Sequence, residues 1–224
     1  MDLKLIVSDA FYFFRSNLFQ IGTLCLPWLV VVAVVENLII STGDPSQGLG
    51  PLFLLAWVFK LLIYPIYTAA LILLMAKRAR NQQPNNRELL SSALKIWQPF
   101  FIVHVMGAGL AALGLMLFII PGIYVVVRLS FAEFYLTLEN IKPVEAIQKS
   151  FQATKPYFFQ ILVLLALFII PLWMLNLLLA NMLSGQEAVP ILNIIIATIT
   201  TFLMLFLDVV MFRVYMSATR VNPV

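Results

Sequence analysis

Five ionisable residues interrupt long apolar stretches of this sequence and are its first candidates for chemistry: Glu36, Lys60, Arg128, Glu133 and Asp208. An ionisable side chain at the centre of a bilayer costs about 2.5–3.5 kcal/mol on insertion scales, so it is retained there for a structural or functional reason. Such charges can pair and hold helices together, or they can bind a lipid headgroup or a polar substrate. The five residues therefore define a candidate lipid, substrate or ion-pair cluster.

The spacing of these residues predicts where they gather. Glu36 and Lys60 fall in the outer parts of their predicted helices, and Arg128 lies about 9 Å along its helix from an outer turn. We therefore expect a polar cluster in the outer half of the membrane. Glu133 follows Arg128 by five residues and faces another side of the helix, so its partner is expected from a different helix. Asp208 lies in the inner part of the last predicted span.

Two interpretations of these charges stay open. In the structural one, Lys60 extends to the outer headgroups and Glu36 is solvated at a helix end. Arg128 then binds a lipid phosphate, or it pairs with Glu133 and fixes the packing of helices. In the functional interpretation, the charges line a polar cavity that receives a lipid or a small amphiphile.

Catalysis of the kind found in soluble enzymes has no support in the sequence. It contains no Walker A loop, no glycine-rich nucleotide fingerprint after a strand, no G-x-S-x-G elbow and no HExxH. His104 is the single histidine and Cys25 the single cysteine, so neither predicts a metal site of three or four ligands. We expect no catalytic residue, no cofactor and no metal, and we rank an enzyme acting on lipid within the membrane third among the functions.

Composition predicts the elements that position these residues. Hydrophobic residues make up 62% and charged residues 11% of the 224 residues, whereas soluble domains carry about 25% charged residues. An apolar helix of about 20 residues crosses the hydrocarbon layer. The sequence therefore predicts an all-α, polytopic membrane protein with six transmembrane helices, expected over residues 18–41, 52–76, 100–120, 123–138, 157–183 and 190–215.

The basic residues predict the orientation of the chain. Apart from Lys60 and Arg128, every lysine and arginine falls in a segment expected on the same face of the membrane as both termini. The positive-inside rule makes this face cytoplasmic. The formal charge of +4 then reflects topology, together with attraction to anionic headgroups of membrane lipids at the cytoplasmic face. Nucleic acid is not expected as a partner, because the basic residues are not gathered on a soluble domain.

Three amphipathic segments precede three of the spans with similar sequences: AFYFFRSNLFQI, ALKIWQPFFIV and SFQATKPYFFQI. Each predicts an interfacial helix on the cytoplasmic side. The single membrane domain, 1–224, then divides into three units of interfacial helix plus transmembrane hairpin, 1–80, 81–140 and 141–220. The alternative is that aromatic belts and amphipathic entry helices recur without duplication.

One stretch, IIPGIYVVVRLSFAEFYLTLENIKPVEAIQKS, carries a more specific pattern. It begins with a Pro-Gly turn at Pro121 and Gly122, followed by an apolar helix that carries the basic residue Arg128. An acidic residue, Glu139, stands where this helix leaves the membrane. An amphipathic helix with the pattern Glu-Ala-x-x-x-Ser follows, with Glu145, Ala146 and Ser150. The stretch resembles the YciC-like bacterial inner-membrane proteins, and it is similar to the membrane domain attached to some glycerophosphodiester phosphodiesterases. The resemblance implies a six-span inner-membrane protein with no established reaction.

Two functions of different classes follow. The first is a non-enzymatic inner-membrane protein that supports envelope or lipid homeostasis or scaffolds other inner-membrane proteins. The alternative is a carrier of a lipid or small amphiphile through a polar cavity around Lys60, Arg128 and Glu133. A cavity lined by these residues would favour the carrier, whereas a dry bundle in which they only pair with one another would favour the scaffold.

Overall fold

The computed structural model describes residues 3–42, 50–183 and 190–221, and the regular elements of these residues are all helical. The long helices are α2 (Leu18–Thr42), α3 (Pro51–Ala79), α5 (Trp97–Leu117), α9 (Phe158–Leu183) and α10 (Pro190–Val221). The shorter ones are α1 (Leu3–Ser16), α4 (Asn86–Lys95), α6 (Ile119–Leu129), α7 (Ala132–Glu139), α8 (Pro143–Thr154) and a 3-10 turn at Lys155–Tyr157. Six segments are long and apolar enough to cross a membrane, with α6 and α7 together counting as one. The prediction of an all-α, multi-pass membrane protein is confirmed.

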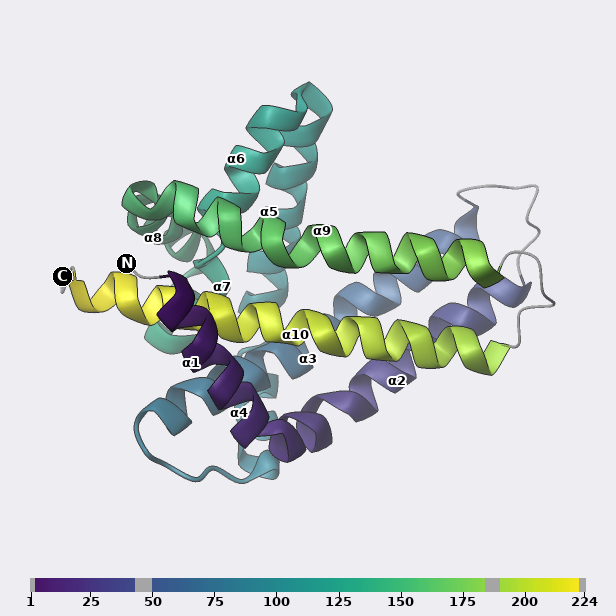
Figure 1. Cartoon of the computed structure of the whole chain (residues 1–224), viewed down its shortest axis with the longest axis horizontal. Helices are drawn as coiled ribbons and strands as arrows, with labels where there is room; N and C mark the ends of the chain where they lie inside the picture. The colour runs from purple at the N-terminus through teal and green to yellow at the C-terminus, as the bar shows by residue number, and fades with distance from the viewer. Residues whose placement is uncertain (1–2, 43–49, 184–189, 222–224) are drawn as a thin grey trace.

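The three amphipathic helices α1, α4 and α8 gather toward the end of the molecule at which α10 finishes (Figure 1). Each carries its apolar residues on one side, and that side contributes buried residues such as Ala10, Leu89 and Ala146. Each also precedes a pair of longer segments, so the order of elements repeats three times along the chain. Duplication of one ancestral unit stays a prediction.

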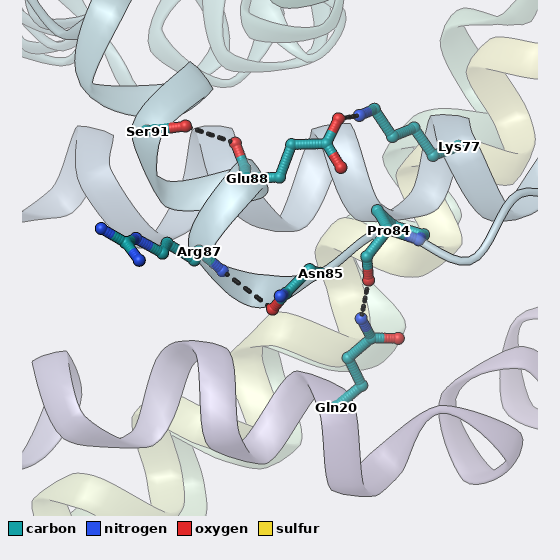
Figure 2. A network of polar contacts seen from close by, with 7 residues as sticks. All are labelled: Gln20, Lys77, Pro84, Asn85, Arg87, Glu88 and Ser91. Atoms are coloured by element: carbon teal, nitrogen blue, oxygen red, sulfur yellow. Dashed lines mark hydrogen bonds and ion pairs between the residues drawn. The ribbon is translucent and has the colours of Figure 1, made fainter.

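A polar network fixes α4 against the long helices (Figure 2). Asn85 caps α4, because its side-chain oxygen accepts a hydrogen bond from a backbone N–H in the first turn. Lys77 at the end of α3 pairs with Glu88 of α4. Gln20 of α2 donates from Nε2 to the carbonyl oxygen of Pro84 at 2.8 Å. The basic connection between α3 and α4 is therefore held to two helices and does not extend freely into solvent.

The buried core lies in the half of the bundle that contains the amphipathic helices α1, α4 and α8. In α3, residues 65–72 are all buried, whereas the helix starts with exposed residues that include Leu54 and Trp57. An aromatic cluster joins α7 to α10, with Phe134 and Tyr135 packed against Tyr215 at ring-centroid distances of 5.5 and 5.1 Å. This half supplies rigid neighbours for α7, the helix that carries Glu133.

Helices α5 and α6 form a hairpin that does not run along the other long helices. Figure 1 shows α2, α3, α9 and α10 extended lengthwise, while this hairpin crosses their direction and ends in a tip to one side. The tip exposes large apolar residues, among them Met116, Phe118 and Ile120. The hairpin therefore stands apart from the four lengthwise helices over its tip.

The chain reverses at Phe118, whose backbone is extended with φ −165° and ψ 159°. The predicted turn at Pro121 and Gly122 is corrected, because both residues lie inside α6. Proline is tolerated there since the first N–H groups of a helix have no intrahelical acceptor. Gly122 instead permits close packing: a Cβ atom built on Gly114 of α5 would lie 2.9 Å from the Cα atom of Gly122.

The predicted single helix over residues 123–138 is also corrected. It is two helices, α6 and α7, separated by a break at Ser130 and Phe131. Neither residue is a glycine or a proline, so the break has no local sequence signal. Its cause lies in α8, which contacts both sides of the break.

Candidate functional site

Ser150 of α8 satisfies the backbone groups that the break between α6 and α7 leaves free. Its hydroxyl donates to the carbonyl oxygen of Arg128 at 2.6 Å, and its oxygen accepts from the backbone N–H of Phe131 at 3.1 Å. Ser150 is fully buried, so water cannot replace these bonds. Thr154, one turn later on α8, reaches the same carbonyl oxygen at 3.4 Å. Helix α8 thereby sets the directions in which Arg128 and Glu133 point.

Glu133 meets side chains from two other helices. Its Oε2 atom accepts a hydrogen bond from the hydroxyl of Tyr64 on α3 at 3.1 Å. Its Oε1 atom lies 2.8 Å from Nδ1 of His104 on α5. The partner of Glu133 does come from a different helix, as the spacing predicts, and both carboxylate oxygens are engaged.

The rings of Tyr64 and His104 hold this arrangement in place. Their centroids lie 4.0 Å apart with an interplanar angle of 30°, so the two rings are in close, tilted contact. An ionised carboxylate can only accept hydrogen bonds, and therefore the proton between His104 and Glu133 belongs on Nδ1. In the neutral imidazole this leaves Nε2 as an acceptor, and a second proton there makes the contact an ion pair.

A cavity of about 280 Å³ adjoins this site. It lies where the α5–α6 hairpin meets α7, α9 and α10, and His104, Glu133 and Ser130 contribute polar groups to its wall. Asp208 of α10 lines it as well, and Asp208 makes no hydrogen bond or ion pair with any described residue. The remaining wall is apolar, and it includes no lysine or arginine. The cavity thus presents two carboxyl groups to whatever enters it.

The expected outer cluster is divided in the structure. Lys60 of α3 pairs with Glu36 of α2, with 3.2 Å between Nζ and Oε1, and the lysine side chain is 46% exposed. Arg128 forms no ion pair with a carboxylate of the described residues. The prediction of one polar cavity around Lys60, Arg128 and Glu133 is therefore wrong. Of these three residues, only Glu133 lines the cavity described above.

Arg128 is buried, with 7% of its surface exposed. The guanidinium carbon lies 5.5 Å from the ring centroid of Tyr124 and 5.4 Å from that of Phe151. One nitrogen donates to the hydroxyl of Thr154 over 3.4 Å, which is a long bond, and Nε has no partner. The positive charge of Arg128 is therefore stabilised mainly by its cation–π contacts with these two rings, each worth about 0.5–2 kcal/mol.

The other positions of the family-like motif build the corner between α7 and α8. Glu139 and Lys149 form an ion pair with 2.7 Å between Oε2 and Nζ. Ala146 is fully buried and allows α8 to pack closely, whereas Glu145 is exposed. With Ser150, these residues position the site and take no direct part in it.

Sequence reasoning missed Tyr64 and considered His104 only as a metal ligand. Both rings lie within apolar spans, and a polar ring in such a span needs a hydrogen-bond partner, which is the available signal. Among the described residues, no group of three or more His, Cys, Asp or Glu side chains has the arrangement of a metal site. The contacts that the structure shows at this site are the hydrogen bonds of Glu133 with Tyr64 and His104.

Comparison with known protein families, curated proteins and solved structures gave no match to this chain. The resemblance to YciC-like proteins rests on the motif from Pro121 to Ser150 and stays a prediction.

Proposed function

We propose that the protein is a membrane carrier for a small cationic amphiphile, and the cavity beside Glu133 and Asp208 is the observation that carries this proposal. Ligand pockets are mostly apolar with a few placed polar groups, and most measure about 300–1,000 Å³. At about 280 Å³, this cavity suits a small ligand. Intramembrane ionisable residues that face a cavity commonly mark substrate or ion pathways.

The charges of the wall select the kind of ligand. Glu133 and Asp208 supply two carboxyl groups, and His104 is the one basic side chain of the lining. A cationic head would balance these carboxyl groups in a low-dielectric site, where opposite charges attract strongly. The apolar part of the wall, which includes Leu165 and Met211, suits a short hydrocarbon tail.

The position of the cavity supports entry from the lipid phase. Ala108 of α5 and Val126 of α6 line the cavity and are exposed on the surface of the bundle. In a membrane, this surface faces lipid chains. An amphiphile dissolved in the bilayer can therefore reach the carboxyl groups without passing through the packed core. We further propose the bacterial inner membrane as the location, with both termini on the cytoplasmic side, which follows from the distribution of basic residues.

A second candidate is the scaffold function, a non-enzymatic role in envelope or lipid homeostasis. The exposed tip of the α5–α6 hairpin favours it, because Met116 and Phe118 project away from the bundle and offer an apolar contact for another membrane protein. This surface carries less weight than the cavity, since lipid chains cover such residues equally well.

The carrier proposal is tested by uptake into proteoliposomes. Octyltrimethylammonium is the probe, and octanesulfonate, an anion with the same chain length, is the matched control. We expect Asp208→Asn to reduce uptake of the cation about 10- to 100-fold, because one of the two carboxyl groups that attract the cationic head in a low-dielectric site is lost. Asp208 makes no hydrogen bond or ion pair with a described residue, so the fold should tolerate this change.

Glu88→Gln is the matched control variant, because Glu88 of α4 pairs with Lys77 of α3 and does not line the cavity. Uptake of octyltrimethylammonium should stay at the wild-type rate in this variant. Equal uptake by wild-type protein and Asp208→Asn, or wild-type uptake no faster than in empty liposomes, would reject the carrier proposal.

A further inference from the structure

Arg128 is a buried cation for which the described part of the chain provides no counter-charge. It makes no ion pair with a described carboxylate, and its exposed surface is 7%. Buried charges in proteins are normally paired, because the loss of hydration is otherwise uncompensated. A buried arginine without a carboxylate partner is therefore expected to bind an anion supplied by another molecule.

The surroundings of Arg128 leave its donors available. The rings of Tyr124 and Phe151 make cation–π contacts with the guanidinium. Such contacts occupy none of its N–H donors. Of the five N–H donors, one makes the long bond to Thr154, and Nε, although buried, makes none. A fork of parallel N–H donors matches the oxygens of a phosphate or a carboxylate.

The location favours a phosphate over a soluble carboxylate. Arg128 lies between α6 and the amphipathic helix α8, at the base of the hairpin. Tyr124, which covers the guanidinium, is 45% exposed, so a single ring separates the charge from the lipid-facing surface. Lys155 follows Thr154 at the end of α8, is exposed, and adds positive charge to this part of the surface. Amphipathic helices of this kind lie at the level of lipid headgroups.

We infer that Arg128, with Thr154 and Tyr124, forms a binding site for a phosphate group, such as that of a phospholipid headgroup held at the base of the α5–α6 hairpin. This site is separate from the cavity at Glu133 and does not depend on the carrier function. Its ligand is anionic, whereas the cavity takes a cation, so the two sites cannot substitute for each other.

The test measures thermal unfolding of the purified full chain in detergent micelles during titration with dioleoyl phosphatidylglycerol. Dioleoylglycerol has the same chains without the phosphate, and inorganic phosphate has the charge without the chains. We expect phosphatidylglycerol to raise the unfolding midpoint of the wild-type protein more than dioleoylglycerol does. Arg128→Gln should weaken the apparent affinity for phosphatidylglycerol about 10- to 100-fold, while Arg128→Lys retains part of it.

Arg213→Gln is the matched control, because Arg213 also lies over an aromatic ring, that of Phe13 at 5.4 Å, in another part of the bundle. Its affinity for phosphatidylglycerol should stay within about twofold of wild type. A midpoint rise of equal size with inorganic phosphate would support the phosphate site and identify a soluble ligand. Equal affinity in Arg128→Gln and wild type would overturn the inference. If Arg128→Gln does not fold, the wild-type protein decides, since equal midpoints with phosphatidylglycerol and dioleoylglycerol would overturn it as well.

Discussion

The contact between Gly114 and Gly122 gives the sharpest test of the hairpin. A Cβ atom on Gly114 would lie 2.9 Å from the Cα atom and 3.2 Å from the nitrogen of Gly122. A Cβ atom on Gly122 would lie 2.8 Å from the backbone nitrogen of Leu115. Favourable carbon contacts need about 3.5–4.0 Å, so an alanine at either position forces the two backbones apart by roughly 0.5–1 Å. Neither backbone can move aside as a flexible side chain would.

The magnitude follows from a comparison of two alanine variants in the same helix. Gly109 has no atom within 4 Å of a built Cβ atom, so Gly109→Ala adds only the helix propensity of alanine, up to about 1 kcal/mol of stabilisation. Gly114→Ala gains the same propensity and also suffers overpacking, which costs about 1–3 kcal/mol. The difference between the two variants isolates the clash. For a protein of this size, it corresponds to roughly 2–12 °C in the unfolding midpoint.

The assay is thermal unfolding of both variants in the same detergent, with the wild-type protein as reference. Gly114→Ala should unfold below Gly109→Ala by the difference given above. A Gly114→Ala protein as stable as Gly109→Ala would show that the two helices are not in backbone contact in the folded protein. The close approach of α5 and α6, and the turn at Phe118, would then have to be abandoned.

Two further predictions concern the break between α6 and α7 and the orientation of the chain. Ser150→Ala removes the main partners of two buried backbone groups and should lower the free energy of unfolding by about 2–4 kcal/mol, whereas Ser91→Ala, at an exposed hydroxyl of α4, should change it by less than about 0.5 kcal/mol. Equal losses would show that Ser150 does not stabilise the break. On a Cys25→Ala background, cysteines at Arg80 and Lys149 should react with an impermeant maleimide from the cytoplasmic side, and labelling of the Arg80 position from the opposite side would reverse the proposed orientation.

The spans were predictable because hydropathy is a local property. The helix expected over residues 18–41 is α2, Leu18–Thr42, and that expected over 157–183 is α9, Phe158–Leu183. The reversal between α5 and α6 was misplaced, because Pro-Gly is a strong turn signal in isolation. Here proline occupies the first turn of a helix, and the glycine is needed for contact with Gly114.

The site was predictable only in part. The spacing of Arg128 and Glu133 correctly indicates that they face different neighbours, but it does not identify those neighbours. Tyr64 and His104 lie in other spans, and which residues of two spans meet depends on how far each helix is shifted along its axis. Packing between helices determines this axial shift, and the hydrophobic pattern of a single helix does not predict it.

The break at Ser130 and Phe131 explains why two opposite charges so close in sequence remain apart. Five residues of unbroken helix would turn one side chain about 140° from the other, and the break adds a change of direction. Arg128 is thereby turned toward Phe151 and Thr154 of α8, while Glu133 is turned toward α3 and α5. Ser150 bonds both the carbonyl oxygen of Arg128 and the N–H of Phe131, so one hydroxyl sets the direction of both charges. A displacement of α8 must therefore move the surroundings of Arg128 and Glu133 together, and one buried residue, Ser150, joins the proposed anion site to the Glu133 site.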